Sequence, residues 1–240
     1  MPTHVFVPVL GKRIRVTRLD NCGRPPAPET ADSWVATNGF ITVNLTSEVE
    51  DGQEIITRRA DGSLCVNERT PNSFKNFTVE AEFCGVDPAL LAIMTNAEGY
   101  EDWAGDLAGI TVPEGAIEKA FALELWTGLS GQACQEGAED AGGYLLLPFV
   151  QAGVLGDLEI GGENAVTFSL SGAFTKGGNA WGVGPYNVLM DPGAGAPAVP
   201  VAAPLPTALD PYDHLLMIDT ALAPPPNAPG ALQPMPAATP

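Results

Sequence analysis

Residues 77–84 read FTVEAEFC, from Phe77 to Cys84. Apolar side chains alternate with polar ones in this stretch, which is the period-two pattern of a β-strand with one face buried and the other in water. Antiparallel sheets commonly have such one-sided burial. The buried face is expected to carry Phe77, Val79, Ala81 and Phe83, and the solvated face Thr78, Glu80, Glu82 and Cys84.

The same alternation recurs in four other stretches, so the chain is expected to be mostly β. Their apolar positions are Ile14 and Val16; Ile41, Val43 and Leu45; Phe121, Leu123 and Leu125; and Val166, Phe168 and Leu170. Residues 144–150 form a continuous apolar run, which is typical of a strand buried on both faces.

Glycine-containing pairs separate these runs and predict tight turns between antiparallel strands. They are Asp51-Gly52, Asp61-Gly62, Gly142-Gly143, Gly161-Gly162 and Gly177-Gly178. One short helix is predicted over residues 88–94, because Asp87 is suited to cap it and Pro88 to its first position. We expect this helix to pack on a sheet edge. The predicted fold is an antiparallel β-sandwich or barrel.

Composition divides the chain into three parts. Residues 1–11 are expected to form an N-terminal arm and residues 12–190 the β domain. Thirteen of the 23 prolines lie in residues 191–240, where Lys and Arg are missing, so much of this part is expected to be an extended tail outside the core. Within it, residues 212–219 (YDHLLMID) predict a short strand or docking segment.

Residues 46–76 predict a long hairpin arm. Strand-like segments at 54–57 (EIIT) and 64–66 (LCV) lie on either side of Asp61-Gly62, among many charged residues. A two-stranded hairpin is marginally stable alone in water. An arm of this length is therefore expected to contact its own body or another subunit.

The charge of the chain argues against binding to nucleic acids or anionic membranes. The chain has 29 Asp and Glu and 11 Lys and Arg, which gives a net charge of −18. Five cations precede residue 25 with one acid, whereas residues 77–165 hold sixteen acids and one lysine. This asymmetry could steer head-to-tail contacts between copies, or it could reflect solvated strand faces. The cations are Lys12, Arg13, Arg15, Arg18 and Arg24.

The start of the chain, with an apolar stretch before the basic residues, is the reverse of a secretory signal, and no apolar run reaches membrane-spanning length. Synthesis in the cytoplasm with reduced thiols is the expectation. The cysteines lack a C-x-x-C pair and are Cys22, Cys65, Cys84 and Cys134.

Catalytic and metal-binding patterns are sparse, so we expect neither an enzyme nor a cofactor. The two histidines, His4 and His214, lie near opposite ends of the chain. Residues 128–131 (GLSG) lack the spacing of a nucleophile elbow, and Pro185 follows the Gly182-Val183-Gly184 of a would-be dinucleotide loop. The carboxylate pair Glu80 and Glu82, and calcium sites at Asp51 or at Glu136, Glu139 and Asp140, are better explained as surface charge.

The order of segments resembles a known family, the major tail (tail tube) proteins of long, non-contractile-tailed bacteriophages of actinobacteria. The matching segments are 15–23 (RVTRLDNCG), 51–55 (DGQEI), 64–66 (LCV), 79–88 (VEAEFCGVDP), 121–128 (FALELWTG), 143–150 (GYLLLPFV), 153–157 (GVLGD) and 181–186 (WGVGPY). They span nearly all of residues 12–190, and no single segment is diagnostic.

The resemblance implies a tail tube β domain that forms hexameric rings, which stack into a tube around a channel for the phage genome. Partners would be further copies of the chain, the tape measure protein, the tail terminator and distal tail proteins, with DNA passing through unbound and no membrane contact. The protein would be assembled in the host cytoplasm and reside in the virion tail. Candidate self-assembly residues are Arg13, Arg15 and Arg18 near the start and Glu54, Ile55, Arg58 and Arg59 in the arm.

Two other functions fit the same sequence. A phage tail terminator, connector or head decoration protein would share the composition but would form one ring and stop. A secreted carbohydrate-binding β-sandwich would use tryptophans as a sugar platform, although core edges or subunit contacts explain these residues equally well. The tryptophans are Trp34, Trp103, Trp126 and Trp181.

Overall fold

The computed structural model describes residues 8–85, 87–129, 142–158, 166–178, 180–193, 199–231 and 233–236. Several predictions fall outside these ranges: most of the N-terminal arm (1–7), Cys134, the Gly161-Gly162 turn and the acidic group at 136–140. The described part is mostly β and antiparallel, with one short helix, as predicted. Its elements are β1 (Pro8–Leu19), β2 (Trp34–Thr37), β3 (Phe40–Glu50), β4 (Glu54–Arg58), β5 (Leu64–Arg69), β6 (Ser73–Cys84), α1 (Pro88–Met94), β7 (Glu98–Glu101), β8 (Leu107–Thr111), β9 (Ala120–Leu129), β10 (Gly142–Gln151), β11 (Val154–Leu155), β12 (Thr167–Thr175), β13 (Leu189–Asp191), β14 (Val201–Ala203) and β15 (Leu216–Thr220).

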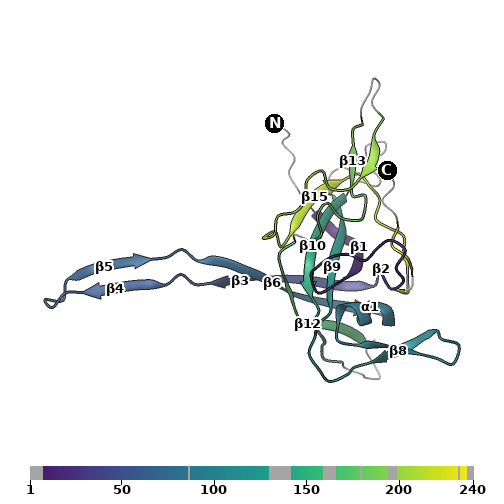
Figure 1. Ribbon diagram of the computed structural model, residues 1–240, viewed down its shortest axis with the longest axis horizontal. Coiled ribbons are helices and arrows are strands. Elements are labelled where there is room, and N and C mark those ends of the chain that lie inside the picture. The colour runs from purple at the N-terminus through teal and green to yellow at the C-terminus, as the bar shows by residue number, and fades with distance from the viewer. Residues whose placement is uncertain are drawn as a thin grey trace.

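One nine-stranded sheet forms the body among the described residues (Figure 1). Seven strands follow the order β2-β1-β9-β10-β12-β6-β3, while β15 pairs with β10 and β11 pairs with β12. Strand β10 is its branch point. The first half of β10 pairs with β15, while Val150 and Gln151 pair with β12. The sheet can therefore turn from β10 toward β12 and β6 while β15 continues the first half.

A first core lies on one face of β1, β9 and β10. It contains the predicted inward residues of these strands, such as Ile14 and Leu123, packed against Val79 and Phe83 of β6 and Leu170 of β12. The strand of residues 77–84 thus has the predicted alternation, with Glu80 exposed and Val79 buried. This sandwich-like packing is the coarse fold that the periodicity predicted.

A second core lies on the opposite face of the same three strands. Trp126 of β9 and Tyr144 of β10 pack there against Trp181, Tyr186 and other residues beyond position 180. Strand β10 is consequently buried on both sides, as its continuous apolar run predicted.

The prediction of an extended tail at 191–240 is wrong for much of that segment. Leu205, Ala228 and Met235 are buried in the second core, and β15 adds a strand to the body over Leu216–Thr220, where residues 212–219 were expected to be one. Strand β13 crosses the proposed boundary at 190 by pairing with β14. Proline-rich chain without a repeating hydrogen-bond ladder serves here as a cover for an apolar sheet face.

Helix α1 begins as predicted, with Asp87 as its N-cap and Pro88 in its first turn. The Asp87 side chain accepts hydrogen bonds from Ala89 N at 2.8 Å and from Gly230 N at 2.6 Å, so it joins the helix to the C-terminal segment. The helix does not sit on a sheet edge, because residues 89–94 are all buried and several belong to the first core.

Local irregularities correct three further predictions. A register shift between Phe40 and Thr42 turns Ile41 outward, so it leaves the inner face that Val43 and Leu45 occupy. Gly142 and Gly143 lie inside β10. The Asp51-Gly52 pair lies between β3 and β4, facing the segment between β5 and β6, and makes no reversal of the chain.

Three hairpins project from the body (Figure 1). The longest is the arm, built from the outer parts of β3 and β6 and continued by β4 and β5. The β7–β8 hairpin leaves the body on the side opposite to the arm, and the β13–β14 hairpin points in a third direction.

Candidate functional site

The arm is the most exposed part of the structure. Every residue of β4 and β5 is exposed, and β3 is exposed beyond Leu45. Four large apolar side chains in β4 and β5 keep 39–49% of their surface in water: Ile55, Ile56, Leu64 and Val66. A free two-stranded ribbon with this much exposed apolar surface gains little from folding alone, so contact with another surface would stabilise it.

The arm ends in a tight turn at Asp61-Gly62, as predicted. Gly62 has φ +85°, which a residue with a side chain rarely adopts. The Ser63 hydroxyl and amide donate to the Asp61 carboxylate and lower its pKa. Arg58 donates to Gly62 O at 3.2 Å, and Arg59 N donates to Ser63 O, so both arginines flank the turn.

The ladder of the arm is interrupted halfway along its length, between β3–β6 and β4–β5. Here Gly52 N donates to Asn72 Oδ1 at 2.9 Å, and Asn72 Nδ2 donates to Asp51 Oδ1 at 3.0 Å. A Cβ at Gly52 would lie 1.7 Å from Thr70 O, so only glycine fits. We call residues 51–53 and 70–72 the arm joint.

At the root of the arm, β6 and β12 contact the C-terminal segment through His214. Thr175 Oγ1 accepts from Phe77 N at 2.9 Å and lies 2.7 Å from His214 Nδ1. The hydroxyl therefore joins β6 and the C-terminal segment, since it has one donor hydrogen and two acceptor lone pairs. Burial lowers the His214 pKa, although Asp213 beside it acts in the opposite direction. Phe74 meets the imidazole edge-on at 5.2 Å.

The predicted self-assembly residues fall into two separate groups. Glu54, Ile55, Arg58 and Arg59 lie together on the outer arm, with Glu54 opposite Arg69 in the ladder. Arg13, Arg15 and Arg18 lie on β1 in the body. The structure thus collects the first group on one element and separates the second group from it.

The prediction for Arg15 is wrong, because this residue is not on the surface. Its guanidinium makes two hydrogen bonds of 2.5 and 2.6 Å to the carboxylate of Glu124 on β9, and both side chains are buried. The guanidinium also lies 3.3 Å from the ring centroid of Tyr186. Arg13 is partly buried and donates to Pro225 O at 2.5 Å, so Arg18 is the exposed member of the three.

Burial and pairing set the acid–base behaviour of this network. Burial by itself would lower the Arg15 pKa, but the Glu124 carboxylate offsets this and raises it. Burial also raises the Tyr144 pKa well above its usual range, and Tyr144 donates to Glu124 Oε1 at 2.7 Å. Arg15 thus pairs with Glu124 inside the fold, beside Tyr144 and Tyr186.

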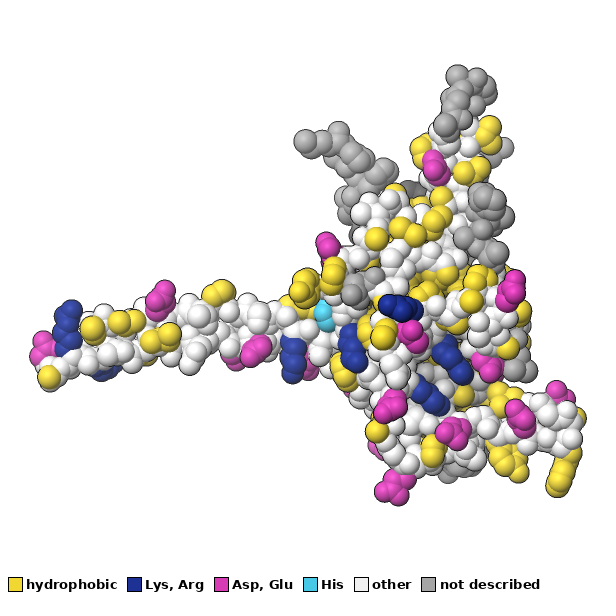
Figure 2. Space-filling model, in the orientation of Figure 1, with side chains coloured by type: hydrophobic (Ala, Val, Ile, Leu, Met, Phe, Trp, Pro, Cys, Tyr) yellow, Lys and Arg dark blue, Asp and Glu magenta, His cyan; other side chains and the backbone are white. Residues whose placement is uncertain are grey.

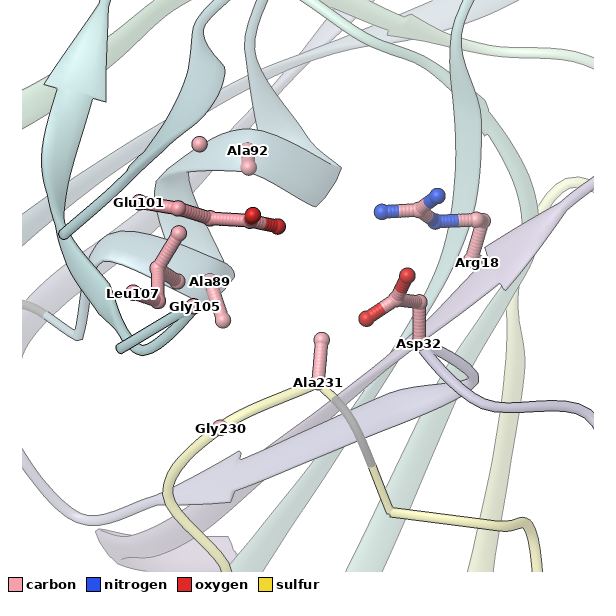
Figure 3. Close-up of a pocket in the computed structure, with 10 residues that line it drawn as sticks. Arg18, Asp32, Ala89, Ala92, Glu101, Gly105, Leu107, Gly230 and Ala231 are labelled. Carbon is pink, nitrogen blue, oxygen red and sulfur yellow. The ribbon is translucent and has the colours of Figure 1, made fainter. Parts of the chain in front are cut away.

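Arg18 lines a cavity of about 240 Å³ between α1 and the β7–β8 hairpin. Figure 3 shows Arg18, Asp32 and Glu101 on its walls, with the guanidinium and the Glu101 carboxylate facing each other from opposite sides. The rest of the lining is small or apolar, and includes Ala89, Ala92 and Gly230. We call this cavity the α1 pocket.

The β7–β8 hairpin was not predicted from the sequence. Trp103 lies at its end and is fully exposed, with a relative exposure of 106%, and Tyr100 is exposed as well. The Asp102 carboxylate holds the turn by accepting from Ala104 N at 2.7 Å and Asp106 N at 3.1 Å. The available signal was the dense run of acids around two aromatic residues in 98–106.

The other tryptophans do not form a platform, because Trp34, Trp126 and Trp181 are buried in the second core. Among the described residues, no group of three or more His, Cys, Asp or Glu side chains is placed to hold a metal ion. Within the same ranges, no helix has both the length and the hydropathy needed to cross a membrane. No protein-family model matches the chain, and no curated protein matches it.

Proposed function

We propose that this protein is a structural virion protein that assembles as stacked, hexameric rings into the tail tube of a long, non-contractile-tailed bacteriophage. The observation that carries the proposal is the arm, a hairpin whose outer strands are wholly exposed and carry four exposed apolar side chains. An element of this kind has a physical reason to bind another protein surface. The resemblance of segments between residues 12 and 190 supplies the virion setting.

Binding to an identical copy accounts for the arm economically, because the arm projects from a body that cannot contact its outer half (Figure 1). When each copy offers an arm and receives another at a different surface, the contact is heterologous and generates closed rings or open filaments. A tube of stacked rings contains both arrangements, because each ring is closed and the stack of rings is open along the tube axis. The cytoplasm of the host is the proposed place of assembly and the virion tail the final location.

The proposed role of the channel is to pass DNA without holding it. A net charge of −18 favours repulsion of phosphates. The tape measure protein, the tail terminator and the distal tail proteins are the proposed partners of the inner wall and the two ends, and neither a cofactor nor catalysis is part of the proposal. The Trp103 side chain is a poor sugar platform by itself, so the carbohydrate-binding alternative has less support than the tube.

Negative-stain electron microscopy of the purified full chain, with light scattering on the same sample, tests this proposal. Tubes or stacked rings with an open channel are expected at high protein concentration. Single closed rings would favour the terminator or connector function instead. A monodisperse monomer at all concentrations and salt conditions, also in the presence of phage tail tips as initiators, would overturn self-assembly.

A further inference from the structure

The arm and the β7–β8 hairpin project from opposite sides of the body (Figure 1), and the outer arm balances Arg58, Arg59 and Arg69 against three acids. At its end the arm carries the arginines Arg58 and Arg59 beside one acid, Asp61, which leaves a small excess of positive charge at the turn. Figure 2 shows Lys and Arg side chains together with an Asp or Glu side chain at that end, and several Asp and Glu side chains along the opposite projection. Within one molecule the two ends are too far apart to meet.

The β7–β8 hairpin carries acids and lacks bases. Residues 98–111 contain Glu98, Glu101, Asp102 and Asp106, without a Lys or Arg. All four are exposed, so their charges act on whatever approaches the hairpin. Opposite charges on two projecting surfaces steer encounter and fix which surfaces meet.

The hairpin and the outer arm both expose apolar side chains, so each offers the other an apolar surface. The hairpin presents the fully exposed Trp103 and the exposed Tyr100, and the outer arm presents Ile55, Ile56, Leu64 and Val66. Trp, Tyr and Arg are the residues that most often dominate binding energy at interfaces, especially when apolar neighbours exclude water from them. An arginine placed over an indole or phenol ring gains cation–π attraction in addition.

The α1 pocket gives the contact a place for one arginine. Asp32 and Glu101 contribute two carboxylates to its wall against the single guanidinium of Arg18, so the pocket has a net negative charge (Figure 3). The small side chains of Ala89, Ala92 and Ala231 leave about 240 Å³ free. The Asp32 and Glu101 carboxylates lie on different walls of the pocket (Figure 3), and either one can accept two hydrogen bonds from a planar guanidinium.

We propose that the arm end of one copy, with Arg58 and Arg59, docks on the β7–β8 hairpin and α1 pocket of the next copy. The contact joins two different surfaces of the same chain, so it links copies into a closed ring or into a repeat along the tube, depending on the rotation between copies. This inference rests on the proposed self-assembly and specifies the receiving surface.

Cross-linking tests which surfaces meet. Cys65 on β5 is a native exposed thiol close to the arm end. With Cys22, Cys84 and Cys134 changed to Ser, Ala104→Cys places a second thiol at the end of the β7–β8 hairpin. Met190→Cys on the β13–β14 hairpin is the matched control, since it is also exposed on a projecting hairpin. A short bismaleimide is expected to give a ladder of linked chains with Ala104→Cys and isolated monomers with Met190→Cys.

The cross-linking and microscopy results together distinguish failure of the proposed contact from failure of the proposed tube assembly. Tubes in the microscope without cross-links from Ala104→Cys, or with equal cross-links from Met190→Cys, would overturn the contact and leave the proposed function standing. A ladder from Ala104→Cys in a sample that forms no tubes would support the contact and overturn the tube. Monomers in both assays would overturn both.

A charge exchange gives an independent test. Arg58→Glu with Arg59→Glu, and Glu101→Arg with Asp106→Arg, are each expected to raise the concentration needed for assembly at least tenfold. All four changes in one chain are expected to restore it to within threefold of the unmodified protein, because each copy then offers and receives the exchanged charges. Lys12→Glu with Arg24→Glu changes the net charge as much as the arm pair and is expected to have little effect. Failure of the fourfold variant to recover, with its fold intact, would contradict the contact.

Discussion

Breaking the buried pair of Arg15 and Glu124 has a large effect on stability, because the charge that is left behind has little access to water. Removing one partner leaves the other charge buried and unpaired, which costs about 3–5 kcal/mol, whereas replacing both with apolar groups is often close to neutral. The pair thus fixes the arrangement of β1, β9 and the C-terminal cover more than it adds net stability.

We expect Glu124→Gln and Arg15→Met each to lower the free energy of unfolding by about 3–5 kcal/mol. The double change Arg15→Met with Glu124→Leu is expected to recover most of that loss. Urea denaturation followed by tryptophan fluorescence measures all three. Additive losses in the double variant would contradict the account, as would a single change without effect.

The contact between His214 and Thr175, called here the His214 latch, predicts a pH dependence of stability. The His214 pKa is lowered in the folded protein, so between the folded value and the usual value near 6.5 the unfolded chain binds more protons. The free energy of unfolding therefore falls as the pH drops below about 6.5 and through the folded pKa. His214→Asn removes this contribution. The stability difference between wild type and His214→Asn, measured by denaturation from pH 7.5 to 5, is expected to shrink with acidification, and a constant difference would refute the latch.

Strands, the helix and the arm are the elements that the sequence predicts well. Each depends on residues that are close in the chain: the alternation in 77–84, the Asp87-Pro88 cap, and the Asp61-Gly62 turn between two strand-like segments. Local pattern suffices because local backbone preference and burial agree at these places.

Other features depend on partners that are far apart in the sequence. Arg15 is buried because Glu124 lies opposite it, 109 residues away. Ile41 points outward because a bulge shifts its register against β6. The C-terminal segment lacks alternation, and its role as a cover appears only when the second face of β9 and β10 is seen to need one.

Replacing the outer arm tests its independence from the body. Glu50 and Ser73 are paired across the ladder, so Asp51–Asn72 can be replaced by Asn-Gly, which favours the tight turn of a two-residue hairpin. We expect the variant to keep its melting temperature within about 3 °C, since the removed strands bury little. It is expected to remain monomeric in light scattering. Normal tubes from this variant would contradict the proposed role of the arm.

Truncation after Met190 is expected to prevent folding. Residues beyond this point cover Trp34, Trp126 and Tyr144 in the second core, and burying each such side chain contributes roughly 1.5–3 kcal/mol. Their sum is comparable to the 5–15 kcal/mol that stabilises a typical domain. The truncated chain should bind a hydrophobic dye and lose its cooperative thermal transition. A cooperative transition in residues 1–190 would restore the interpretation of this segment as a tail.

At the scale of the whole molecule, charge acts at two ranges. The net charge of −18 makes copies repel at a distance, whereas the docked surfaces proposed above attract in contact. The screening length falls from about 30 Å at 0.01 M salt to about 8 Å at 0.15 M, which weakens the distant repulsion more than close pairs.

We therefore expect the rate of assembly to rise by about tenfold or more as sodium chloride rises from about 0.01 to 0.15 M. Over this range the screening length falls below the size of the body. Time-resolved light scattering at fixed protein concentration measures the rate. Glu29→Gln with Asp210→Asn, which remove exposed acids that do not line the α1 pocket, should reduce the salt effect. A rate that falls steadily from the lowest salt would mean that contact attraction outweighs the net repulsion.

The arm joint also determines where the arm can bend. At residues 51–53 and 70–72 the continuous ladder gives way to a few water-exposed hydrogen bonds, several of them from side chains, such as that between Asn72 and Asp51. Such bonds resist bending less than a paired ladder does. Neighbouring bodies linked through this point can tilt against each other while both ends of the link stay attached. A filament whose copies are joined through their arms would bend at these points, so its flexibility would be set by the few residues around Gly52.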